Sequence, residues 1–176
     1  MTYKLVLFFH ILSMIGLATA DVFQWTMFRN AGCARNGEQS IRWIRSTARL
    51  PLVVFPSLIT VLGTGIYLAA RINAFSQGWI SASFLAILLI AVFSIAAGPA
   101  IRALQSRAQE GKSEEIQRLL PRPLLVAPLR LRLALLLTII FLMVMHTNLA
   151  SSLQITGVGI ACGLLWGVLA IRQAKS

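Results

Sequence analysis

The fold is decided by the stretch Leu5–Phe28, which reads LVLFFHILSMIGLATADVFQWTMF. It exceeds the about 20 apolar residues that a helix needs to cross a bilayer. Its polar residues His10 and Asp21 lie eleven positions apart, so at about 100° per residue they fall about 20° apart around the helix. Met14 and Gln24 continue this stripe. We expect the stripe to face a protein interior or a water-filled cavity, because lipid does not solvate such groups.

The composition of the whole chain agrees with a membrane protein. Of its 176 residues, 57% are hydrophobic and 12% are charged, whereas a soluble domain is about 25% charged. Four further apolar stretches are long enough to span. The sequence predicts an all-α polytopic membrane helix bundle, with residues 1–176 as one domain and five transmembrane helices at about 5–28, 50–70, 79–101, 131–147 and 155–171.

Basic residues collect on one side of this predicted bundle. Five lie in the loop 29–49, seven in the loop 102–132 and two in the tail, whereas the other side has only Lys4 and Arg71. The positive-inside rule then puts the amino terminus outside and the carboxyl terminus in the cytoplasm of a bacterial inner membrane. The same rule accounts for the net charge of +11. We expect no nucleic-acid partner, because no RNA-binding signature accompanies the charge.

The first stretch could also be a secretory signal, since Ala18-Thr19-Ala20 matches a small-residue cleavage pattern. Its removal would leave the arginine-rich segment 29–49 outside, against the charge rule. We expect the first helix to be retained.

Two short helices are expected in the basic loops. Ile41, Trp43 and Ile44 predict an amphipathic helix that lies at the membrane interface. Ser113 followed by two glutamates predicts the capped start of a second helix.

The last predicted span carries Gly159, Gly163 and Gly167 at four-residue spacing. Such a glycine face lets two helix backbones approach closely. Packing within the monomer is the favoured use, and a homodimer through this face is the alternative.

The two histidines of the chain fall in the same leaflet under this topology. His10 lies in the outer part of the first span and His146 in the outer part of the fourth. Two histidines on facing helices can ligate haem b. Met14 and Met143 lie at a similar level, and a His/Met set makes copper the second choice. The plainer alternative is a pair of interfacial histidines bonded to backbone or water.

Asp21 and Gln24 are candidates for a proton or cation path. The favoured alternative for Asp21 is an ion pair with an arginine near the cytoplasmic end: Arg102, Arg130 or Arg132. No nucleophile motif or phosphate-binding loop is present, so an enzyme is the less favoured class. Cys33 and Cys162 lack the spacing of a zinc site.

Several short motifs carry a family resemblance. They are Leu7-Phe8-Phe9-His10-Ile11-Leu12 with Gly16, Pro56 with Leu62-Gly63-Thr64-Gly65, and Gly78-Trp79-Ile80. Over about the first hundred residues the chain resembles small bacterial integral-membrane proteins related to the copper-resistance D and protoporphyrinogen-oxidase J-type membrane families. The resemblance implies a haem or copper site at His10. The J-type lysine of the third span is missing here, so porphyrinogen oxidation is not implied.

Three function classes therefore remain open. The histidines favour a haem- or metal-binding redox module. The glycine face and short loops favour a non-catalytic accessory subunit of a larger membrane complex. Asp21 and Gln24 favour a small transporter or proton-path protein.

Overall fold

The protein is a bundle of long helices in a computed structural model that describes residues 1–120 and 123–173. Five helices in this part are long and apolar enough to cross a membrane, which confirms the predicted all-α membrane bundle. The long helices are α1 (Thr2–Gly32), α3 (Pro51–Arg71), α4 (Gly78–Gln109), α6 (Pro123–Met145) and α7 (Leu149–Gln173). The short helices are α2 (Gly37–Ser46), the 3-10 turn η1 (Thr47–Arg49) and α5 (Ser113–Leu119).

The helix ends differ from the predicted span ends. α4 passes through Pro99 and continues to Gln109, so the predicted end at residue 101 is wrong. α7 begins at Leu149 rather than 155, because the Asn148 side chain accepts a hydrogen bond from the Ser151 backbone N–H at 2.9 Å and caps the helix. α6 ends at Met145, which leaves His146 outside the helix.

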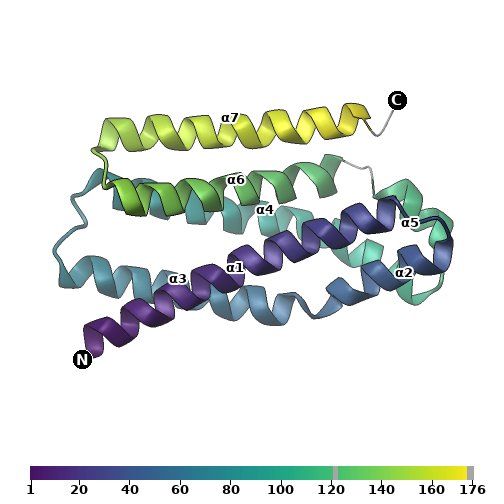
Figure 1. The fold of residues 1–176 in the computed structure, drawn as a ribbon, viewed down its shortest axis with the longest axis horizontal. Coiled ribbons are helices and arrows are strands. Elements are labelled where there is room, and N and C mark those ends of the chain that lie inside the picture. The colour runs from purple at the N-terminus through teal and green to yellow at the C-terminus, as the bar shows by residue number, and fades with distance from the viewer. Residues whose placement is uncertain (121–122, 174–176) are drawn as a thin grey trace.

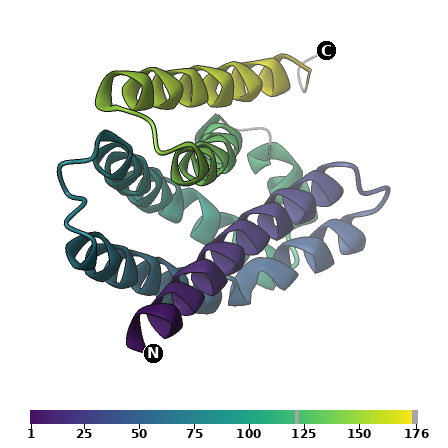
Figure 2. The same cartoon turned by 60° about the vertical axis from the view of Figure 1, so that its left-hand side comes forward.

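The long helices pack as neighbours around α6, which lies centrally (Figure 1). α1 packs on α3, α4 packs on α6, and α7 covers the other side of α6. Figure 2 shows the α1–α3 pair and the α6–α7 pair as separate layers. The main core lies between these layers and includes Leu17, Ile87, Leu135 and Ile139.

A second core closes the end of the bundle that holds α2 and α5. Ile44 of α2 is fully buried there with Leu104 of α4 and Ile116 of α5. Arg45 donates hydrogen bonds to the carbonyl oxygens of Ala108 and Gln109, at 3.1 and 3.3 Å, and so satisfies the carboxyl end of α4. The expected amphipathic α2 is present, but Ile44 packs on protein rather than lying in a membrane interface.

The start of the two short helices follows different rules. The Asn36 side chain accepts a hydrogen bond from the Gln39 backbone N–H at 3.0 Å and caps α2. The predicted cap of α5 at Ser113 is wrong, because Lys112 occupies the cap position and makes no side-chain cap.

The glycine face of α7 packs against α6. A side chain added at Gly163 would press on Leu131 and Ala134, one added at Gly167 would reach Ala127, and one added at Gly159 would strike Thr138. These contacts lie inside the monomer, so the same face is not available to a second copy. The favoured use of the glycines is the one observed, and the predicted homodimer through this face is wrong.

Candidate functional site

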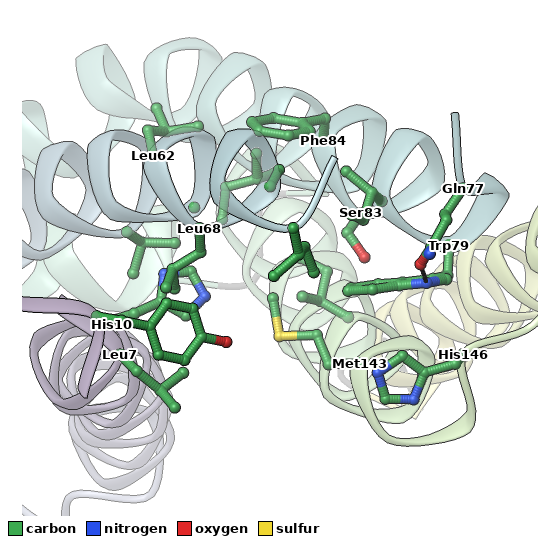
Figure 3. A pocket seen from close by; sticks show the side chains of 18 residues that line it. Leu7, His10, Leu62, Leu68, Gln77, Trp79, Ser83, Phe84, Met143 and His146 are labelled. Carbon is green, nitrogen blue, oxygen red and sulfur yellow. Dashed lines mark hydrogen bonds between the residues drawn. The ribbon is translucent and has the colours of Figure 1, made fainter. Parts of the chain in front are cut away.

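An apolar cavity of about 420 Å³ lies between α1, α3, α4 and α6, in the half of the bundle away from α2 and α5. Most of its wall is aliphatic or aromatic, with Leu7, Leu68 and Phe84 among the lining residues. The polar lining residues are fewer and include His10, Ser83 and His146, as Figure 3 shows. A mostly apolar cavity with a few convergent polar groups is the usual form of a small-molecule site.

His10 is held in one orientation by α3. The imidazole is 7% exposed, and its Nδ1 lies 2.9 Å from Thr64 Oγ1. The Thr64 hydroxyl already donates its hydrogen to the Thr60 carbonyl oxygen at 2.5 Å. We therefore assign His10 Nδ1–H as the donor to Thr64, which leaves the Nε2 lone pair free. Gly65 makes room, since a Cβ there would sit 3.3 Å from the His10 ring.

His146 follows the last turn of α6. Its backbone is left-handed, with φ of 49°, a conformation in which histidine is enriched among non-glycine residues. The ring packs edge-on against Trp79, with centroids 4.8 Å apart. Its Nδ1 lies 3.2 Å from the Val144 carbonyl oxygen. A carbonyl only accepts, so Nδ1 carries the proton and Nε2 is again the free nitrogen.

The two histidines line the same cavity but do not meet. Figure 3 shows His10 at one end and His146 at the other, with Met143 between them. Met143 is part of the cavity wall, whereas Met14 is buried in the main core and is not among the lining residues. Within residues 1–120 and 123–173, no group of three or more His, Cys, Asp or Glu side chains could hold a metal ion.

Ser83 is a polar wall residue that the sequence did not single out. It is 8% exposed, it lines the cavity, and its Oγ finds no hydrogen-bond partner among the described residues. Its neighbour Trp79 is already satisfied, since its indole N–H donates to the Gln77 side chain at 2.6 Å. A buried hydroxyl without a partner costs free energy, so a bound ligand with an acceptor atom would stabilise this site.

Asp21 lies deeper in the bundle, away from the cavity wall. It is 1% exposed and forms an ion pair and hydrogen bond with Arg132 of α6, which is 5% exposed. Arg132 is one of the three partners that the sequence suggested. Gln24, one turn further along α1, is also buried. Neither Asp21 nor Gln24 lines the cavity, and the Asp21 charge is matched within the protein.

No protein-family model, curated protein or solved structure matches this chain. The function must therefore be argued from the cavity itself.

Proposed function

We propose that this integral membrane protein is a redox-type binding module that holds haem b in the cavity lined by His10 and His146. One observation carries the proposal: each imidazole places Nδ1 on a protein oxygen and keeps Nε2 free, on the wall of one apolar cavity. A histidine that ligates a metal usually donates its other ring N–H to such an oxygen.

The cavity suits a planar apolar group in size and character. Its volume of about 420 Å³ lies in the range of about 300–1,000 Å³ that small-molecule sites occupy. His10 Nε2 is the first ligand, because its orientation is fixed by Thr64. The second ligand is His146 or Met143, and both are known partners of haem iron. When bound, haem would supply one-electron redox chemistry.

Copper is the second choice of ligand for the same residues. The Met143 thioether and the His10 imidazole are donors that reduced copper accepts. Only two or three such donors line the cavity, so a copper ion would keep an open position for another ligand.

The absorption spectrum of the purified protein, expressed with ample haem, tests the proposal. His10→Ala should abolish the Soret band. Loss of the band in His146→Ala with an unchanged Met143→Leu assigns a bis-histidine pair, and the reverse result assigns His/Met. Met145→Leu is the matched control, because Met145 is exposed and does not line the cavity. A colourless protein without copper contradicts the proposal and favours the accessory-subunit class.

The bond that fixes His10 offers a second test. Thr64→Val keeps the shape of the side chain but removes the acceptor of His10 Nδ1–H. Loss of such a partner weakens metal binding by about 10–100-fold, so haem titration should show this drop. Thr60→Val is the control, because only the backbone oxygen of Thr60 takes part. Equal affinities in the two variants would remove the reason for choosing His10.

The proposed location is a bacterial inner membrane, with the amino terminus outside. The distribution of basic residues supports this orientation, which puts the cavity in the outer leaflet. Arg122 and Lys175, two of the residues counted for it, lie outside the described residues.

A second candidate is a lipid-soluble ligand with hydroxyl and carbonyl groups, such as a quinol. Ser83 Oγ–H, which has no partner in the described part of the chain, would donate to an acceptor of this ligand, and the free Nε2 atoms would accept from its hydroxyls. Ile72 lines the cavity and is 50% exposed, so the cavity reaches the lipid-facing surface. Mass spectrometry of co-purified lipids should find such a ligand in the parent protein and in Ser81→Ala, and a reduced amount in Ser83→Ala. Equal amounts in both variants would contradict this candidate.

A further inference from the structure

Four side chains from three helices form a continuous row at the end of the bundle that holds α2 and α5. The Trp25 ring of α1 and the Trp166 ring of α7 have centroids 6.0 Å apart. The Arg29 guanidinium lies 5.8 Å from the Trp25 centroid. On the other side, the Arg130 guanidinium of α6 lies 5.0 Å from the Trp166 centroid. We call Arg29, Trp25, Trp166 and Arg130 the Arg–Trp row.

The charges of this row are not balanced by the protein. Asp21 is committed to Arg132. Glu110 and Glu115 pair with Arg107 and Lys112 on α4 and its following turn. Across residues 1–120 and 123–173, no salt bridge includes Arg29 or Arg130. Two guanidinium groups therefore share one surface region without an acidic partner.

Beside the row, two buried donors lack partners. The Nε–H groups of Arg130 and Arg132 are buried and find no hydrogen-bond acceptor among the described residues. Arg130 uses another nitrogen to donate to the Trp166 carbonyl oxygen at 2.5 Å, and Arg132 uses its own to hold Asp21. A buried charged donor without an acceptor is costly, so an anionic oxygen brought to this region would be stabilised.

The position of the row suits a lipid headgroup. Tryptophans gather where a membrane meets water, and Trp166 and Arg29 are both exposed at this end of the bundle. Figure 1 shows the ends of α1 and α7 that carry the row on the same side as α2 and α5. Arginine binds phosphate through its planar fork of N–H groups, and basic sites between spanning helices bind anionic lipid headgroups.

We propose that the Arg–Trp row binds the phosphate headgroup of an anionic phospholipid in the leaflet next to α2 and α5. The Arg29 and Arg130 guanidiniums hold the phosphate from the two ends of the row, and the tryptophan rings lie at the level of the headgroup. Each arginine near an anionic surface favours binding by about fivefold, so the two together give a preference of about 30-fold over a zwitterionic lipid. This site is separate from the cavity and does not depend on its ligand.

Native mass spectrometry of the full chain with phosphatidylglycerol and phosphatidylcholine in competition tests the proposal. The parent protein should retain phosphatidylglycerol with the preference given above. Arg29→Gln and Arg130→Gln should each lose about fivefold of it, and the double variant nearly all. Arg42→Gln is the matched control, an exposed arginine of α2 at the same end of the bundle.

Further arms keep the test decisive. Arg130→Lys keeps the charge without the planar fork, so it should fold and still bind more weakly than the parent. Inorganic phosphate should not displace the lipid, and displacement at low concentration would show that the site takes free phosphate instead. An unchanged preference in the double variant, or an equal loss in Arg42→Gln, would overturn the proposal in favour of diffuse surface charge.

Discussion

Asp21 and Arg132 form the ion pair that joins α1 to α6, and both are almost fully buried. Two charges removed from water lose much of their hydration, and their attraction repays this only when the pair stays intact. Such a pair gives less net stability than its geometry suggests, yet removal of either partner leaves the other charge stranded. Its clearest effect is to fix which face of α1 meets α6.

The residue-scale prediction concerns this pair. Asp21→Leu and Arg132→Leu should each lower the free energy of unfolding by about 3–5 kcal/mol, because one buried charge remains. Asp21→Asn should cost less than Asp21→Leu, since its amide oxygen still accepts from Arg132. Unfolding in mixed micelles measures these changes.

The double variant Asp21→Leu/Arg132→Leu is the control for this reasoning. Without either charge, it should regain most of the stability, because apolar side chains replace a buried pair at little cost. A double variant as unstable as the sum of the single variants would show that other contacts of these residues matter more.

At the residue scale, the sequence predicted what helical periodicity encodes. The shared stripe placed His10 and Asp21 on the inward face of α1, and both are buried. Met14 lies on the same stripe, but it packs in the core rather than on the cavity wall. Ser83 could not be found, because a serine in an apolar helix usually bonds its own backbone, and only the structure shows that it does not.

The α6–α7 contact shows how an element depends on residues without side chains. Gly163 lets the two helices approach so closely that an added Cβ would lie 2.9 Å from Leu131 Cδ1 and 3.1 Å from Ala134 Cβ. The spacing predicted close helix contact, but it could not identify the partner helix, since glycine faces serve both monomers and dimers.

The element-scale prediction is that Gly163→Val separates α7 from α6. Overpacking of this kind costs about 1–3 kcal/mol, and unfolding in mixed micelles should show the loss. Gly157→Val is the control, because a Cβ at Gly157 meets nothing within 4 Å. Equal losses in both variants would mean that helix propensity, rather than close packing, explains the effect.

Helix ends were the least predictable part of the elements. Prolines suggested stops, but Pro56 and Pro99 lie inside continuous helices. Neighbouring helices can satisfy the backbone groups that a proline frees in a membrane. The cap at Asn148 depends on a side-chain hydrogen bond to Ser151, which a hydropathy pattern does not contain.

For the whole molecule, composition and hydropathy were enough to predict five spanning helices, which the structure shows. Their lateral arrangement was not predictable, because lipid and protein interior are equally apolar and leave little pattern to distinguish them. The meeting of α1, α3, α4 and α6 around the cavity therefore came only from the structure.

The whole-molecule prediction is the orientation of the bundle. After replacement of Cys33 and Cys162, which are exposed, an impermeant thiol reagent should label cysteines placed at Ser76 or Ser151 from outside intact cells. A cysteine at Gln109 should react only after permeabilisation, because the basic loops follow the positive-inside rule. Labelling of Gln109→Cys in intact cells would reverse the proposed orientation.

The Asp21–Arg132 pair also constrains how the protein is made. The two residues lie 111 positions apart, so at cellular rates of synthesis Asp21 emerges on the order of ten seconds before its partner. A lone aspartate at the centre of a spanning helix opposes insertion by about 2.5–3.5 kcal/mol. We expect the nascent α1 to wait at the insertion machinery until α6 arrives, and chains that stop before Arg132 to be left for proteolysis.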